Sequence, residues 1–60
     1  MNLIAELIGK KITVYSEAEG AERQDIGVLQ SAEGSWIKIH KESGETLYFQ
    51  LSRIRMVKPF

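Results

Sequence analysis

The hydrophobic pattern of the chain changes its period after the first glycine. Positions 3, 4, 7 and 8 are apolar, which is helical spacing, and Gly9 follows as a stop signal. With Asn2 as the cap, this spacing predicts a short N-terminal α-helix; an apolar first strand is the alternative. A helix of under two turns is marginal alone, so its apolar stripe must pack against the rest of the protein.

From Lys10 onward, apolar and polar residues alternate with a period of two, which is typical of strands with one buried face. The predicted strands are Lys10–Ser16, Asp25–Ala32, Ser35–Lys41, Glu45–Leu51 and Arg53–Lys58. Turn signals stand at Glu33-Gly34, at Glu42-Ser43-Gly44 and around Ser52, and Pro59 closes the last run.

Two segments depart from plain alternation. The polar, acidic stretch Glu17–Gln24, centred on Gly20, is predicted to be an exposed loop. Gly27 lies inside the second strand, where a glycine often marks a sharp bend or a close backbone approach. These elements together predict one domain, residues 1–60: an all-β, five-stranded, strongly bent antiparallel SH3-like barrel with a short N-terminal α-helix.

Composition adds a stability problem. A chain of 60 residues buries only about 60% of the surface that it exposes when unfolded. It has no Cys and one His, so neither a disulfide nor a Cys/His zinc site stabilises it. We therefore expect it to associate with copies of itself. No apolar run approaches the roughly 20 residues of a membrane span, and no secretory signal is visible, which predicts a cytoplasmic protein.

Four stretches of the chain resemble one family. They are Leu7-Ile8-Gly9-Lys10-Lys11-Ile12-Thr13-Val14, Gly27-Val28-Leu29, Trp36-Ile37-Lys38-Ile39 and Leu47-Tyr48-Phe49-Gln50-Leu51-Ser52-Arg53-Ile54. The pattern resembles the Sm-like (LSm) small barrels and is similar to Sm-related domains of spore-coat type. The resemblance implies a homo-oligomeric ring of five to seven copies, in which the fourth strand of one copy pairs with the fifth strand of the next. The implied interface residues are Phe49, Gln50, Leu51, Ile54 and Met56.

The RNA-binding signatures of that family match this chain at two positions. In the loop between the second and third strands, the family usually carries an acidic residue, and Glu33 is the only residue of this loop that matches it. Near the start of the fifth strand, only Arg53 corresponds to the basic residue of the second signature.

Charge is unevenly distributed, although eight Lys and Arg balance eight Asp and Glu. Residues 1–33 hold three basic and six acidic side chains, whereas residues 34–60 hold five basic and two acidic ones. Cations bind phosphates and aromatic rings stack on bases, so this second half predicts a nucleic-acid surface. Its candidate residues are Trp36, Lys38, His40, Tyr48, Arg53, Arg55 and Lys58. The alternative is a solvated face whose cations pair with Glu17, Glu19, Glu22 or Asp25, with Trp36 in a packing role.

Enzymatic chemistry has no support in the sequence. His40 stands alone, and the carboxylate pairs fall in predicted loops of a barrel too small for a substrate pocket. We expect no catalytic residue, metal, cofactor or small-molecule substrate. The predicted function is a non-enzymatic, ring-forming Sm-like protein that binds RNA. One alternative is a protein–protein scaffold or adaptor; another is a monomeric SH3-like module that docks peptides around Tyr15, Trp36 and Tyr48.

Overall fold

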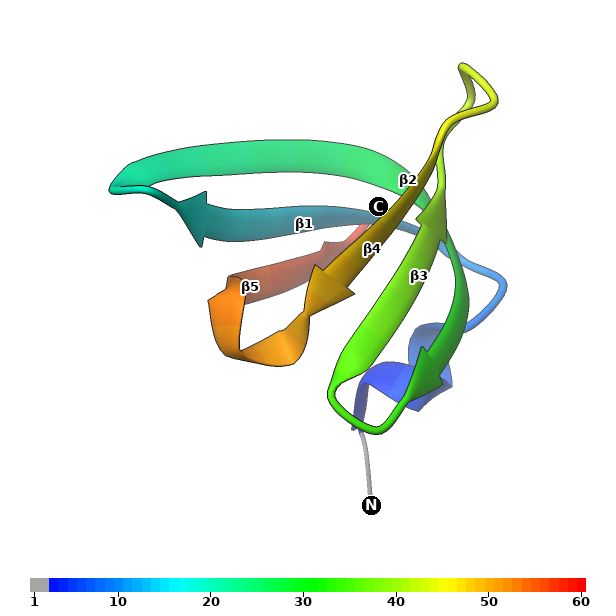
Figure 1. Cartoon of the computed structure of the whole chain (residues 1–60). Helices are drawn as coiled ribbons and strands as arrows, with labels where there is room; N and C mark the ends of the chain where they lie inside the picture. The colour runs from blue at the N-terminus through cyan, green and yellow to red at the C-terminus, as the bar shows by residue number, and fades with distance from the viewer. Residues whose placement is uncertain (1–2) are drawn as a thin grey trace.

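The computed structural model describes residues 3–60, so the predicted cap at Asn2 lies outside the described residues. Its strands form a single antiparallel sheet in the order β4-β3-β2-β1-β5 (Figure 1). The elements are η1 (Leu3–Leu7), β1 (Lys11–Ala18), β2 (Ala21–Glu33), β3 (Trp36–His40), β4 (Thr46–Gln50), η2 (Leu51–Arg53) and β5 (Ile54–Pro59), where η denotes a 3-10 helix. The predicted all-β class with five antiparallel strands is confirmed.

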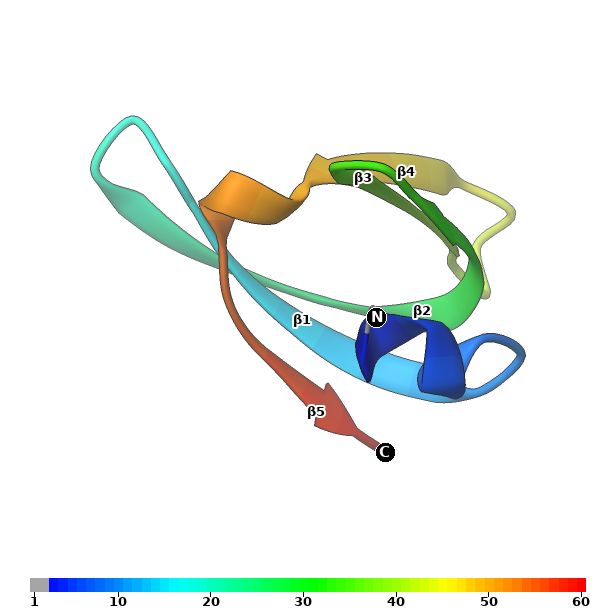
Figure 2. The same cartoon turned by 90° about the horizontal axis from the view of Figure 1, so that it is seen from below.

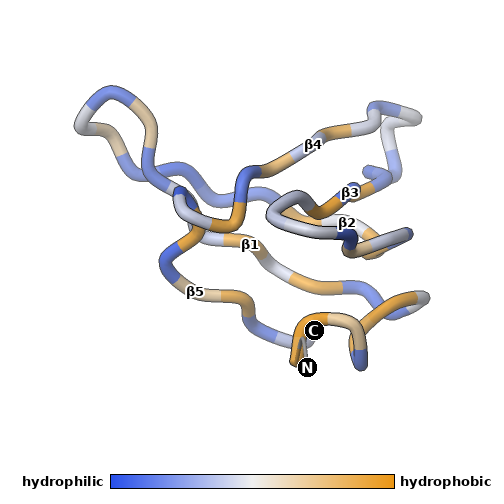
Figure 3. Tube along the Cα trace, turned by 60° about the horizontal axis from the view of Figure 1, so that its bottom comes forward, coloured by the Kyte–Doolittle hydropathy of each residue, from blue (hydrophilic) through white to orange (hydrophobic). Residues whose placement is uncertain are grey.

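The sheet is strongly curved, and the core lies on its concave side (Figure 2). Five aliphatic side chains are at most 1% exposed: Ile12, Val14, Leu29, Ile37 and Ile39. They come from β1, β2 and β3, and they are the alternating apolar residues of those strands. The hydrophobic segment η1 packs against this core through Ile4 and Leu7 (Figure 3). The apolar stripe of the N-terminal segment therefore has the packing role that its spacing predicts.

The prediction of an N-terminal α-helix is wrong, because the structure has a 3-10 helix there. Two backbone hydrogen bonds at its end span three residues: Ile8 N–H donates to the Ala5 carbonyl at 3.3 Å, and Lys10 N–H donates to the Leu7 carbonyl at 2.9 Å. Gly9 then takes a φ of 89°, which ends the segment. A segment this short favours the tighter 3-10 form, in which the same apolar side chains reach the core.

The prediction of a loop at Glu17–Gln24 is also wrong. These residues continue β1 and β2 into a hairpin, in which Glu17 pairs with Glu22 and the turn is Glu19-Gly20. Both turn residues have positive φ, 51° and 79°, as a tight hairpin turn requires. β1 pairs with β5 only as far as Ser16, so the hairpin tip extends beyond the rest of the sheet (Figures 1 and 2).

The close backbone approach predicted at Gly27 is confirmed. A Cβ atom added there would lie 2.5 Å from Ile39 Cγ2 and 2.8 Å from the His40 carbonyl oxygen. The absence of a side chain at Gly27 therefore lets β3 lie against the curved part of β2. The remaining strands lie within about two residues of the predicted boundaries, since their alternating residues pack on the core.

Candidate nucleic-acid interface and strand edges

Four of the predicted RNA-binding residues lie together on the outer face of β3 and β4. Strand alternation places Trp36, Lys38 and His40 on the face opposite to the buried Ile37 and Ile39. Lys38 lies opposite Tyr48 in the antiparallel register, and His40 lies opposite Thr46. We call Trp36, Lys38, His40 and Tyr48 the aromatic strip.

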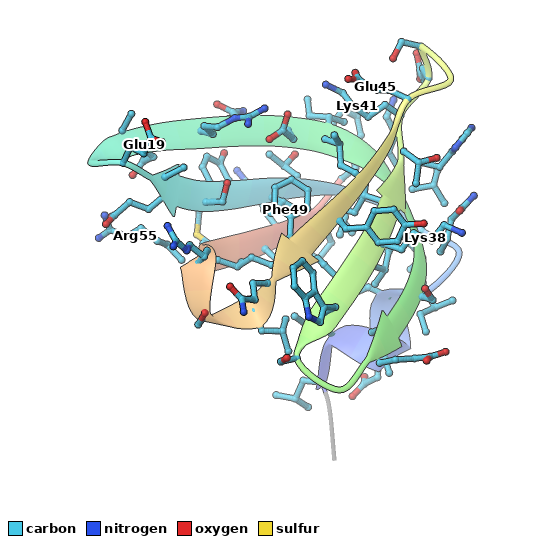
Figure 4. All side chains as sticks on the ribbon, in the orientation of Figure 1. Glu19, Lys38, Lys41, Glu45, Phe49 and Arg55 are labelled. Atoms are coloured by element: carbon cyan, nitrogen blue, oxygen red, sulfur yellow. The ribbon has the colours of Figure 1, made fainter. Side chains whose placement is uncertain are left out.

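The two rings of the aromatic strip are open to solvent: Trp36 is 49% exposed and Tyr48 is 63% exposed. The ammonium of Lys38 lies 5.9 Å from the centroid of the Tyr48 ring, and Figure 4 shows the Lys38 side chain beside β3. His40 Nδ1 lies 3.3 Å from Oγ1 of Thr46, its cross-strand neighbour. A cation and two exposed aromatic rings therefore lie on the same face of β3 and β4.

A groove of about 290 Å³ adjoins the strip where β4 faces the β1–β2 hairpin. Trp36 and Tyr48 line it together with Arg53, which comes from η2, and Arg23, which comes from β2. Within residues 3–60, Arg53 has no ion-pair partner, so its charge is available to a ligand. Arg23 is absent from the predicted site, because the sequence pattern predicts a loop for its segment.

Arg55 and Lys58 lie away from the aromatic strip. The Arg55 guanidinium is 3.1 Å from Glu17 Oε2 and 3.8 Å from Glu22 Oε2, so its charge is shared with two carboxylates of the hairpin. This is the pairing that the alternative interpretation of the charges expects. Lys58 lies on β5 opposite Thr13, at the other edge of the sheet.

The predicted interface residues lie on or between the two edge strands. Phe49 and Gln50 belong to β4, Leu51 to η2, and Ile54 and Met56 to β5. Phe49 is half-buried against the core and projects from β4 toward β1 (Figure 4). Met56 is 50% exposed. Because β4 and β5 end the sheet, each has one side without a strand partner among residues 3–60.

The free side of β5 adjoins an apolar groove. Its apolar lining residues are Ile4, Leu51, Ile54, Met56 and Val57. They come from η1, η2 and β5, which are distant in sequence. An open strand edge beside apolar surface is a site at which another strand adds to a sheet.

Asp25 is a buried carboxylate on β2, the strand that also carries Arg23. It is 5% exposed, and its Oδ1 atom lies 3.5 Å from Lys41 Nζ and 3.6 Å from Arg23 Nη2. Its Oδ2 atom is buried without a hydrogen-bond partner among the described residues. The carboxylate therefore holds two cations against the inner face of β2, and it restrains Arg23 at the rim of the groove.

No protein-family model, curated protein or solved structure matches this chain. Residues 3–60 contain no cluster of three or more side chains suited to holding a metal ion. Over the same residues, no helix has the length and apolar character to cross a membrane. The features of this structure that bear on function are the exposed aromatic rings, the cations beside them and the two sheet edges.

Proposed function

We propose that this protein is a non-enzymatic, Sm-like small barrel that binds single-stranded RNA on the aromatic strip and assembles into rings through its two sheet edges. The observation that carries the proposal is that two exposed rings, Trp36 and Tyr48, lie on one face of the sheet beside Lys38, with Tyr48 directly opposite Lys38 and Trp36 two residues before it. Exposed aromatic rings on a sheet are a common platform for unstacked bases.

Each part of the strip has a distinct role in this proposal. Trp36 and Tyr48 stack on successive bases, and each such contact contributes roughly 1–3 kcal/mol. Lys38 and Arg53 neutralise the phosphates that link those bases. Because every base has a π face and every phosphate the same charge, this arrangement favours single strands with little sequence preference.

The assembly part of the proposal rests on the edges and on size. Among residues 3–60, β4 and β5 each have one side without a strand partner, and a strand from another copy pairs with the backbone N–H and C=O groups there. The apolar groove beside β5 gives such a strand a surface on which to bury side chains. A heterologous contact between β5 of one copy and β4 of the next closes into a ring, as the family resemblance implies.

The RNA proposal is tested with a labelled oligouridine and fluorescence anisotropy at low salt. We expect binding that weakens steeply as salt increases, and Trp36→Ala and Tyr48→Ala variants that bind about tenfold more weakly or worse. Phe60→Ala is the matched control, since Phe60 is an exposed ring with a lysine ammonium 4.4 Å from its centroid but lies outside the strip. An unchanged affinity in both strip variants would contradict the proposal.

A protein–protein scaffold is the second candidate, and the apolar groove beside β5 is the observation that favours it. Such a scaffold assembles through the same edges but has no affinity for RNA. Assembly without oligouridine binding at low salt would therefore favour the scaffold over the RNA-binding protein.

A further inference from the structure

Two of the cations on the outer face of the sheet lie far apart: Lys38 is on β3, next to the edge strand β4, and Lys58 is on the opposite edge strand, β5. The aromatic strip lies on β3 and β4, whereas Lys58 lies on β5 with three strands between β4 and β5. Within residues 3–60, Lys58 makes no ion pair, and Met56 beside it is half exposed. Nothing in one copy brings these two side chains to the strip.

Strand register shows that both edges present these residues on the same face of the sheet. His40 of the strip pairs with Val28, and Val28 pairs with Lys11 of β1. Two residues further along β1, Thr13 pairs with Lys58. Partners in a ladder lie on one face, and so do residues two apart in a strand, so Lys58 shares the face of the strip. Met56, two residues before Lys58, shares it too.

We propose that the RNA-binding surface is completed by a second copy of the chain, whose Lys58 and Met56 lie beside Tyr48 at the joined edges. The inference rests on the proposed function, because it requires both assembly and RNA binding. When β5 of one copy adds to β4 of the next, the two strands lie about 4.8 Å apart. A continuous sheet keeps the outward residues of both strands on one side, so the strip extends across the seam.

The chemistry of the two edge strands suits an anionic ligand at this seam. Neither β4 nor β5 contains Asp or Glu, and β5 contributes two cations while β4 contributes none. Joining these edges therefore brings no two cations of the paired strands together, and it places Lys58 next to an exposed ring. A nucleotide stacked on Tyr48 then has Lys38 of its own copy on one side and Lys58 of the neighbouring copy on the other.

Mixed assemblies distinguish a shared site from a site within one chain. Lys38→Glu and Lys58→Glu chains are prepared separately and also refolded together, and each preparation is assayed with labelled oligouridine. Each single variant is expected to bind roughly tenfold more weakly than the unmodified protein, because a cation at every seam becomes an anion. In the mixed assembly, about one quarter of the seams take Lys38 from one chain and Lys58 from the other, so binding returns there. Lys10→Glu, an exposed cation outside both edges, is the control and is expected to bind nearly as well as the unmodified protein.

The possible results separate the two proposals. Recovery of affinity in the mixed assembly, above both single variants, supports the shared site. If the unmodified protein assembles and binds RNA but the mixture binds no better than its stronger parent, the shared site is wrong and the proposed function stands. If the unmodified protein binds no oligouridine or stays monomeric, the proposed function fails and the shared site fails with it.

Discussion

Replacing Gly27 by alanine tests the packing that gives the sheet its curvature. Gly27 does not have a positive φ, so its backbone conformation is open to alanine. Given space, such a change stabilises a protein by about 0.4–1 kcal/mol, because it restricts the unfolded chain. Here the added Cβ would lie 2.5 Å from a methyl of the fully buried Ile39 and 2.8 Å from the carbonyl oxygen of His40.

Neither neighbour is free to move away, since Ile39 is enclosed by the core and the carbonyl oxygen belongs to the β3 backbone. Relief requires β3 to separate from β2, which disturbs the pairing of Val28 with His40. Overpacking of this kind destabilises by about 1–3 kcal/mol. The total stability of a chain of 60 residues is about 3–9 kcal/mol, so the loss is a large fraction of it.

The assay is urea unfolding followed by circular dichroism at one fixed protein concentration, because assembly makes the midpoint depend on concentration. Gly44→Ala is the comparison, since Gly44 has a φ of 94° and a Cβ atom added there would meet nothing within 4 Å. That variant is expected to lose about 1 kcal/mol from backbone strain alone. A Gly27→Ala protein that is as stable as the unmodified one, or more stable, would refute the close-approach argument.

Two further predictions concern the charged groups. Asp25→Asn leaves the half-buried Lys41 without its counter-charge, so we expect the free energy of unfolding in urea to fall by about 1–3 kcal/mol. The double variant with Lys41→Met is expected to lose less free energy of unfolding than the two single variants together. Strict additivity would show that the pair does not interact. Arg55→Ala removes contacts between exposed groups only, so its free energy of unfolding is expected to change by less than about 1 kcal/mol. A larger loss would show that the β1–β2 hairpin, which carries Glu17 and Glu22, depends on the Arg55 guanidinium.

The strands that pack on the core were predictable from the sequence. In β3 and β4, every second residue is apolar, and a glycine-containing turn precedes each strand. The alternation and the turn signals therefore predict the same strand boundaries. Gly27 was also predictable, because a glycine inside a strand has few physical explanations other than a bend or a close approach. Alternation predicts which side chains face the core: Ile37 and Ile39 of β3 are buried, and Leu47 and Phe49 of β4 are partly buried.

The strand structure of residues 17–24, at the end of the β1–β2 hairpin, was not predictable in this way. These residues extend beyond the core, and their side chains are exposed. Their strand structure comes from backbone pairing and the turn at Glu19-Gly20, neither of which needs apolar residues. For the same reason Arg23 was missing from the predicted site. Its position beside Trp36 and Arg53 depends on the curvature of the whole sheet, and no local pattern encodes it.

The central claim is that the open edges at β4 and β5 join copies of this chain. Sedimentation velocity over a wide range of protein concentration tests it most directly, with circular dichroism to verify that the protein stays folded. We predict a species several times the 6.8 kDa mass of one chain that persists on dilution. A fully folded species of 6.8 kDa at every concentration would contradict the claim.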